Sequence, residues 1–249
     1  MLLAIDIGNT SIHNGIFEGR ALKKAFRVPS DSGGLKRLYH GKIRPYLNKI
    51  DRVMIVSVAP AALKKTEKAL TALLGRRIEV VGRDVDSGVR NLYRRPGQVG
   101  QDRLVNARAA HDLYGGACVI VDFGTAVTID IVNRKKEYLG GAIAAGAEIS
   151  LWALSERTAL LPKTAIRRPK GILGKETSES MVIGAVRGLS SLCDGLAAQM
   201  KKRCCKGATR VVATGGLSAL IGRYCENIDK IDPLLTLKGL RLISEDRHV

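Results

Sequence analysis

The chain has 249 residues, of which 45% are hydrophobic, so it can fill the core of one large domain or two ordinary ones and is not a disordered or fibrous protein. Its net charge of +18 favours a surface that attracts polyanions. Aromatic residues, however, make up only 4% of the chain and do not alternate with the basic groups. We therefore expect a solvated basic surface and no nucleic-acid site. No stretch approaches the roughly 18 uncharged apolar residues of a membrane span, and Asp6 interrupts the first apolar run too early for a secretory signal, which predicts a soluble, cytoplasmic protein.

The first half alternates expected strands with expected helices. Short, β-branched segments typical of strands occupy residues 1–7, 12–17, 53–58 and 78–81, and leucines recur at helical spacing over 61–74. This alternation predicts an α/β layer. A loop rich in glycine and proline then leads into an expected helix over 102–114, which the "YGG" at 114–116 ends.

The second half repeats the first in outline. A strand, a turn and a returning strand are expected over 119–132, followed by a strand and a glycine-rich turn at 138–146. Apolar residues at helical spacing predict a helix over 178–200. The segment "RVVATGGLS" at 210–218 is typical of a buried strand that enters a second glycine turn.

Two apolar runs are interrupted in the same way, by "DIGNT" from Asp6 and "DFGT" from Asp122. We expect Gly8 and Gly124 to adopt backbone angles that a side chain forbids, so that backbone N–H groups approach an anion, while a threonine in each turn adds a hydroxyl donor. Because an aspartate repels a bare phosphate, the pattern predicts a cation between the two, either Mg²⁺ or a monovalent ion. One Asp-x-Gly is also an ordinary turn, but two in matching context predict binding of a nucleotide's phosphates from both sides.

Other nucleotide motifs fail on spacing. "GILGKETSE" at 171–179 is not a P-loop, because Pro169 stands where its first glycine belongs and Glu176 where its Ser or Thr belongs. The glycines of "ATGGLS", Gly215 and Gly216, fit either a backbone lying against an adenosine or a plain packing turn.

Asp102 and Arg103 stand at the start of an expected helix, after Gly100. One interpretation is a helix-capping aspartate beside a surface arginine. The other is that Asp102 accepts a hydroxyl proton during phosphoryl transfer while Arg103 stabilises the moving phosphoryl group. Their position between two expected phosphate-binding halves favours the second.

The cysteines are odd in number and have neither a CxxC pair nor metal-ligand spacing. The sequence therefore predicts reduced thiols rather than disulfides or a zinc site, with a buried thiol at Cys118, which lies in an apolar run. The other four are Cys193, Cys204, Cys205 and Cys225.

Taken together, these motifs resemble the type III pantothenate kinases, in the superfamily of acetate kinase, sugar kinases and actin, over nearly the whole chain. The segments that carry the resemblance are "DIGNT" at 6–10, "YRRPGQVGQDRLVNA" at 93–107, "YGG" at 114–116, "VDFGTAVT" at 121–128, "YLGGAIAAG" at 138–146, "GKETSESM" at 174–181, "ATGGL" at 213–217 and "LTLKGLRLI" at 235–243.

The resemblance implies phosphorylation of pantothenate by ATP to 4′-phosphopantothenate, the first step of coenzyme A biosynthesis. It also implies an α/β fold of duplicated ribonuclease H-like (actin-like ATPase) domains, residues 1–112 and 113–249, with a central nucleotide cleft. Asp102 matches the general base, Asp6 a Mg²⁺ ligand, and Asp122 the ligand of a monovalent cation, K⁺ or NH₄⁺.

The resemblance further implies two binding sets and a homodimer. Thr177 matches a threonine that reaches the pocket of the partner subunit. His13 departs from the family, in which its strand is more apolar. The implied ATP-binding residues are Asp6, Ile7, Gly8, Asn9, Thr10, Ser11, Ile12, His13, Thr125, Gly215 and Gly216, and the implied pantothenate-binding residues are Tyr93, Gly100, Gln101, Asp102, Arg103 and Thr177.

Two alternatives remain. One is another small-molecule kinase of the same superfamily with an altered pocket. The other is a non-catalytic regulator of the Bvg accessory factor type that binds nucleic acid, which the charge favours and the retention of Asp6, Asp102 and Asp122 disfavours.

Overall fold

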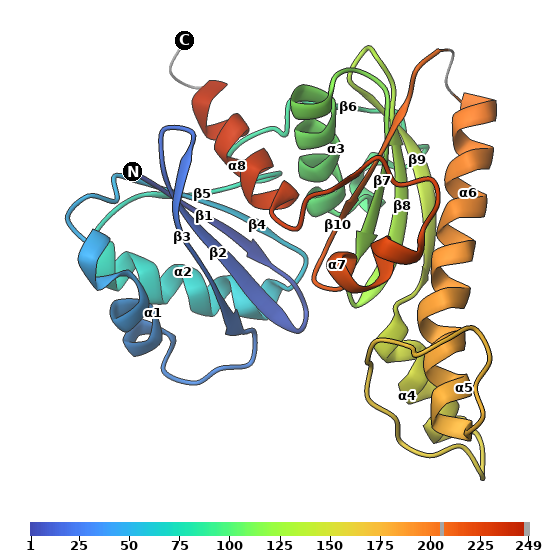
Figure 1. The fold of residues 1–249 in the computed structure, drawn as a ribbon. Helices are drawn as coiled ribbons and strands as arrows, with labels where there is room; N and C mark the ends of the chain where they lie inside the picture. The colour runs from blue at the N-terminus through green and yellow to red at the C-terminus, as the bar shows by residue number, and fades with distance from the viewer. Residues whose placement is uncertain (205–206, 247–249) are drawn as a thin grey trace. The chain divides into compact units, whose positions relative to one another are not determined.

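The computed structural model describes residues 1–204 and 207–246, and its contacts divide the chain into two compact units. The first unit contains Met1–Ala109 and the segment that begins at Leu235, and the second contains Ala110–Leu234 (Figure 1). The sequence placed the end of the chain in its second half. In the structure, the C-terminal helix α8 (Leu235–Glu245) packs against β1 and β4 of the first unit, because its leucines are buried there. The division into two related halves, 1–112 and 113–249, stays a prediction.

The sheet of the first unit has five strands in the order β3-β2-β1-β4-β5. β1 pairs antiparallel with β2, which pairs antiparallel with β3, whereas β4 runs parallel to β1 and β5 runs parallel to β4. The strands are β1 (Leu2–Ile7), β2 (Ser11–Glu18), β3 (Ala21–Pro29), β4 (Arg52–Ser57) and β5 (Ile78–Val80).

Helices cover both faces of this sheet, which explains why β1 and β4 are apolar on both sides. Helices α1 (Leu35–Ile43) and α2 (Pro60–Leu74) share one hydrophobic cluster with side chains such as Leu3 and Ile55. Helix α8 contacts β1, β2 and β4. The sequence missed α1 and the edge strand β3, because β3 is largely exposed and carries basic residues instead of a buried apolar row.

The expected helix over 102–114 is α3 (Gln101–Tyr114). The loop before it contains a two-residue strand, β6 (Arg90–Asn91), and a 3₁₀ turn at Pro96–Gln98.

The second unit repeats the strand pattern of the first. Its strands lie in the order β9-β8-β7-β10-β11, with β7-β8-β9 antiparallel and β10 parallel to β7. This order matches β3-β2-β1-β4-β5 strand for strand, so the internal repeat predicted from the sequence is confirmed in topology. The strands are β7 (Cys118–Phe123), β8 (Ala126–Val132), β9 (Glu137–Ala145), β10 (Arg210–Thr214) and β11 (Lys230–Ile231).

One long helix covers a face of this second sheet (Figure 1). It comprises α5 (Thr177–Ile183), a π-helical turn at Gly184–Gly188 and α6 (Leu189–Cys204), so the expected helix is confirmed with longer bounds. Its apolar side chains pack with those of β7, β8 and β10 in one cluster. Two further helices, α4 (Ala147–Arg157) and α7 (Ser218–Ile221), complete the unit.

The helix over Thr177–Cys204 is also, within the described residues, the one segment long and apolar enough to cross a membrane. This is weak evidence, because 44% of its most apolar window is buried in the unit and the core helices of soluble proteins pass the same test. The expectation of no membrane association stays a prediction.

The described cysteines are free thiols, as predicted. Cys118 and Cys193 are buried, and Cys204 is exposed. Burial raises the pKa of Cys193 and Cys225 to about 12, which keeps both protonated at neutral pH. Cys205 lies outside the described residues.

Candidate active site

The first aspartate turn joins β1 to β2 at the edge of the first sheet. Asp6, at the end of β1, is partly buried and pairs across the sheet with His13, while Asn9 and Thr10 are exposed. The N–H of Gly8 donates to the carbonyl oxygen of Ser11 at 3.1 Å and closes the turn.

The backbone angles expected for the turn glycines are wrong, while the expected approach of their N–H groups to an anion stays a prediction. Neither Gly8 nor Gly124 has a positive φ. Instead, a Cβ added at Gly8 would lie 3.2 Å from the carbonyl oxygen of Ser11, and one at Gly124 would lie 3.2 Å from that of Ala126. A side chain at either position would therefore need the neighbouring carbonyl to shift by a few tenths of an ångström.

Ser30, which the sequence did not single out, anchors this turn from the end of β3. Its hydroxyl donates to the carbonyl oxygen of Gly8 at 2.7 Å, and its N–H donates to that of Thr10 at 3.1 Å. Ser30 itself is 7% exposed, whereas Thr10 is exposed, so the anchor lies at the boundary between the core and the open turn. A serine 22 residues from its partner leaves no local pattern by which it could have been found.

His13 is neutral at physiological pH. Burial, and secondly the charge of Arg27 on the neighbouring strand, lower its pKa to about 4. Its Nε2 lies 2.9 Å from the hydroxyl of Ser11. The residue therefore offers the turn a hydrogen bond and no positive charge.

Asp102 lies in the first turn of α3, at the same sheet edge as the β1–β2 turn. A Cβ on Gly100 would meet Oδ1 of Asp102 and would lie 3.5 Å from Cγ1 of Val58. Val58 in turn donates its N–H to the carbonyl oxygen of Ile7 at 3.1 Å. Oδ1 of Asp102 also accepts the N–H of Arg103 at 2.9 Å. The structure thus brings the predicted base and the first predicted phosphate turn together within one unit.

The interpretation of Arg103 as a surface arginine is wrong, because the residue is only 7% exposed. The side chain of Arg103 is buried, and a buried guanidinium requires partners of opposite charge or hydrogen-bond acceptors.

Two residues that the sequence missed support the remaining pocket candidates. Asn91 accepts the N–H of Tyr93 at 3.0 Å and donates to the carbonyl oxygen of Pro96 at 3.2 Å, which fixes the loop before α3. Gly82 has a φ of +86°, and a Cβ there would collide with the side chain of Gln101.

The second aspartate turn joins β7 to β8, and two further turns pack against it. A Cβ on Gly215 would meet Oδ1 of Asp122, and one on Gly146 would meet the carbonyl oxygen of Thr125. The N–H of Gly146 donates to that same oxygen at 3.2 Å, and Leu217 donates to Phe123 at 3.1 Å. Gly215 has a φ of +92°. Its packing against Asp122 accounts for this glycine, while Gly216 is exposed.

Comparison with known proteins identifies the family. The family model for type III pantothenate kinase matches residues 2–199. The chain belongs to the type III pantothenate kinase family. Curated relatives with that name include proteins from Moorella thermoacetica and Geobacter sulfurreducens, and each is 41% identical to this chain. Both alignments cover 98% of this chain, and they cover 99% of the Moorella protein and 98% of the Geobacter protein.

Solved structures agree on the fold. A conserved putative Baf family transcriptional activator from Campylobacter jejuni has a TM-score of 0.62 at 20% identity, with 99% of this chain and all of that chain covered. A ROK family glucokinase from Streptomyces griseus has a TM-score of 0.56 at 11% identity, with 98% and 99% covered. Such likeness supports the predicted two-domain, actin-like α/β fold and says nothing of the substrate.

Within this type III pantothenate kinase family member, the described residues contain no group of three or more His, Cys, Asp or Glu side chains that could hold a metal ion by themselves. A single carboxylate such as Asp6 still fits Mg²⁺, which commonly binds through one or two carboxylates, water and substrate phosphates. Asp122 likewise offers a single, partly buried carboxylate, and its Oδ1 lies against the backbone of Gly215. Thr177, the first residue of α5, is exposed.

Proposed function

We propose that this chain transfers the γ-phosphoryl group of ATP to the primary hydroxyl of pantothenate, giving 4′-phosphopantothenate and ADP, the first step of coenzyme A biosynthesis. The observation that carries the proposal is the position of Asp102 at the sheet edge of the β1–β2 turn, in a chain 41% identical to named type III pantothenate kinases over nearly its whole length.

Asp102 is proposed as the general base. Its carboxylate takes the hydroxyl proton as the hydroxyl oxygen bonds to the γ-phosphorus and the bond from that phosphorus to the β,γ-bridging oxygen breaks. Arg103 is proposed to bind negative charge on pantothenate or on the moving phosphoryl group. Its burial supports this role, since a guanidinium held away from water interacts more strongly with an anion.

The two aspartate turns are proposed to bind ATP. Asp6 would hold the Mg²⁺ of the nucleotide, with the backbone and hydroxyl groups from Gly8 to Ser11 directed to its phosphates. Asp122 would hold K⁺ or NH₄⁺, with Thr125, Gly215 and Gly216 near the nucleotide. The cations would neutralise phosphate charge that the two aspartates otherwise repel.

Tyr93, Gly100 and Gln101 are proposed to form the pantothenate pocket with Arg103. The fixed loop from Asn91 to Pro96 supports this assignment, because a rigid wall lowers the entropy lost on binding.

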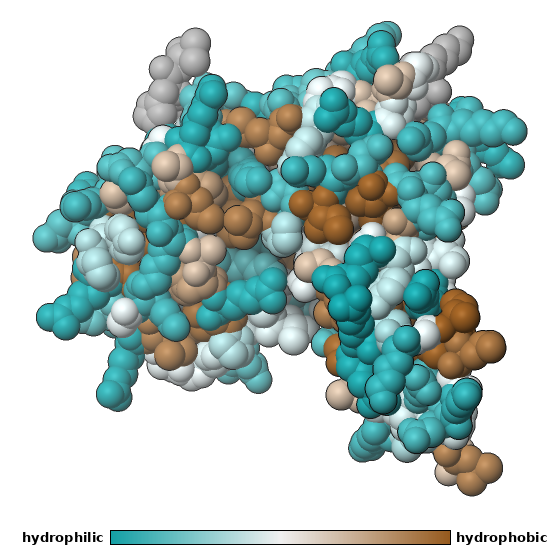
Figure 2. All heavy atoms as spheres, viewed as in Figure 1, coloured by the Kyte–Doolittle hydropathy of each residue, from teal (hydrophilic) through white to brown (hydrophobic). Residues whose placement is uncertain are grey.

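A homodimer with shared active sites is proposed, in which Thr177 reaches the partner's pocket. The exposed apolar side chains of the second unit support it: Leu160 is 91% exposed, Leu173 80%, Ile172 64% and Trp152 61%. Figure 2 shows hydrophobic side chains at the end of that unit where α4 and α5 lie. A cytoplasmic location without membrane or nucleic-acid partners completes the proposal.

The proposal is tested by incubating the protein with ATP, Mg²⁺, K⁺ and a panel of small hydroxyl compounds that includes pantothenate, followed by mass spectrometry of the products. We expect phosphopantothenate as the main product. Phosphorylation of another compound instead would indicate an altered pocket. Absence of any product together with salt-sensitive nucleic-acid binding would indicate the regulator.

A further inference from the structure

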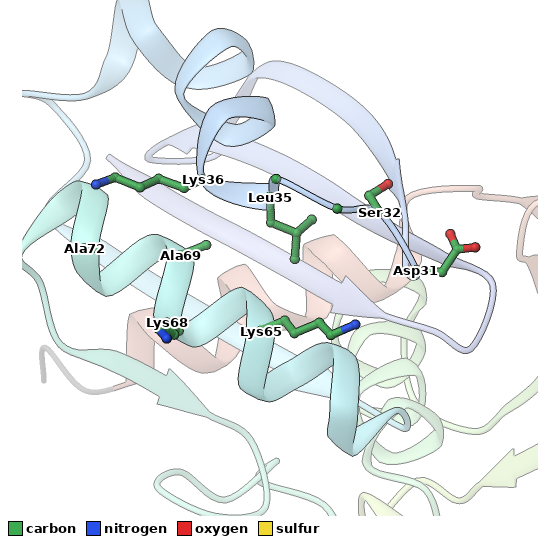
Figure 3. Close-up of a pocket in the computed structure, with 10 residues that line it drawn as sticks. Asp31, Ser32, Leu35, Lys36, Lys65, Lys68, Ala69 and Ala72 are labelled. Carbon is green, nitrogen blue, oxygen red and sulfur yellow. The ribbon is translucent and has the colours of Figure 1, made fainter.

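A cavity of about 510 Å³ lies between α1 and α2 in the first unit, among residues that neither the predicted nucleotide site nor the predicted pantothenate site contains (Figure 3). Its volume is in the range of small-molecule sites. The lining residues are Asp31, Ser32, Gly33, Gly34, Leu35, Lys36, Lys65, Lys68, Ala69 and Ala72.

The floor of the cavity is apolar. Leu35 extends from the start of α1 toward α2, where it faces Ala69 (Figure 3). Leu35 and Ala69 are 6% and 8% exposed, whereas Ala72 is exposed at one end of the cavity. An apolar group of a ligand would therefore replace water against these side chains.

Three exposed lysines stand at the rim of this floor, and their side chains point in different directions (Figure 3). Lys36 comes from α1, and Lys65 and Lys68 come from α2 (Figure 3). Over the described part of the chain, none of the three forms an ion pair. Glu67, their acidic neighbour on α2, is instead bound to Arg83 at 2.7 Å. The lysines thus leave the cavity with uncompensated positive charge, opposed only by Asp31 among its lining residues.

The backbone at the start of α1 adds to this preference. The helix follows Gly34 without a side-chain cap, so the positive end of its dipole at Leu35 and Lys36 is not offset by a capping side chain and favours a nearby anion. A Cβ on Gly33 or Gly34 would meet nothing within 4 Å, so the loop leaves open space there. The surrounding sequence is basic as well: residues 20–49 contain nine lysines and arginines and a single acidic residue, Asp31.

We propose that this cavity binds a small soluble organic phosphate, with its phosphate bound at the rim that carries Lys36, Lys65 and Lys68 and its apolar part on Leu35 and Ala69. A phosphate monoester carries close to two negative charges at neutral pH and three acceptor oxygens. Uncompensated ammonium groups at the rim therefore attract it more strongly than they attract a carboxylate, which carries a single charge.

The site adds to the proposed kinase function and does not depend on it. Its loop wall, which begins at Asp31, follows directly on Ser30, the residue that binds Gly8 and Thr10 of the first aspartate turn. A ligand in the cavity would thus contact the chain next to that anchor.

The test is calorimetric binding of octyl phosphate to the full chain at low salt. We expect the variant Lys36→Gln/Lys65→Gln/Lys68→Gln to bind about tenfold more weakly or worse, a difference of about 1.4 kcal/mol. The matched control Lys42→Gln/Lys49→Gln/Lys64→Gln removes the same charge from exposed lysines of the same unit that do not line the cavity, and should bind as the wild type does. Octanol supplies only the apolar chain, and inorganic phosphate supplies only the charged group. Each should bind at least about tenfold more weakly than octyl phosphate.

A second variant covers the case in which the triple variant fails to fold. Ala72→Trp fills the cavity from an exposed position, keeps all three lysines, and should abolish binding. Equal losses in the two triple variants, wild-type binding by Ala72→Trp, or displacement of octyl phosphate by a non-hydrolysable ATP analogue would each overturn the proposal. Binding only to phosphatidic acid vesicles would also overturn it, in favour of a membrane surface.

Discussion

The hydroxyl of Ser30 donates a 2.7 Å hydrogen bond to the carbonyl oxygen of Gly8, across 22 residues of sequence. A second bond, from the N–H of Ser30 to the carbonyl oxygen of Thr10, fixes the other side of the same turn. The direction of the turn's remaining N–H groups therefore depends on a residue outside the Asp-x-Gly motif.

Replacing Ser30 with alanine should raise the KM for ATP about three- to tenfold and leave the KM for pantothenate unchanged, because only the phosphate turn loses an anchor. The free energy of unfolding should fall by about 1 kcal/mol, the usual contribution of one such bond. Ser30→Thr keeps the hydroxyl and should restore the KM. A loss of stability with an unchanged KM for ATP would show that Ser30 has no positioning role.

Replacing Gly215 with alanine should raise the K⁺ concentration needed for half-maximal activity, because the new Cβ would meet both Oδ1 of Asp122 and the backbone of Phe123 and so displace the second aspartate turn. The matched control is Gly116→Ala, also in the second unit. Gly116 has a φ of +80°, so alanine there incurs the same backbone strain of about 1 kcal/mol, but its Cβ meets only Cγ of Arg134 at 3.5 Å. Steady-state activity against K⁺ concentration distinguishes them, and equal behaviour of the two variants would contradict a cation site at Asp122.

His13 should make the fold sensitive to acid. Its pKa is about 4 in the folded protein and about 6.5 when unfolded, so the unfolded chain binds more protons between these values. The stability from His13 is therefore complete above pH 6.5, falls as the pH drops toward 4, and changes no further below that. Urea unfolding of the wild type and His13→Gln at pH 7.5, 5.5 and 4.5 checks this prediction. The wild type should lose more stability than the variant on acidification, and parallel losses would be the contrary result.

The exposed apolar side chains of the second unit, which include Leu160 and Leu173, should hold two chains together. In the wild type, light scattering coupled to size-exclusion chromatography should give twice the chain mass of 26.8 kDa. Leu160→Glu/Leu173→Glu should give monomers that remain folded, since both side chains are largely exposed. Leu113→Glu, at a leucine 38% exposed on α3, should stay dimeric. A monomeric wild type would remove the basis for a shared active site.

The sequence predicted the parts of the molecule that local pattern determines. The two aspartate turns, the helix that begins beside Asp102 and the buried strands all follow from periodicity and turn chemistry over a few residues. The repeat from Asp6 to Asp122 was visible because each turn keeps the same spacing within matching strands.

What the sequence missed depends on contacts between distant segments. Ser30 and Asn91 act through hydrogen bonds that no periodic pattern signals. The burial of Arg103 and the return of α8 to the first unit depend on packing, which a linear sequence does not show. Gly8 and Gly124 were identified correctly, but their φ angles are not positive, and the carbonyl that lies close to each of them comes from a neighbouring residue that the motif does not reveal.

General-base catalysis of pantothenate phosphorylation by Asp102 is tested by a coupled assay of ATP consumption with pantothenate, with and without K⁺, on the wild type and Asp102→Asn. We expect pantothenate-dependent, K⁺-dependent turnover in the wild type. In the variant, kcat should fall by about 10²- to 10⁴-fold, the usual range for loss of a general base, with the melting temperature and the KM for ATP preserved. A wild type without pantothenate-dependent turnover, or an Asp102→Asn variant with full activity, would contradict it.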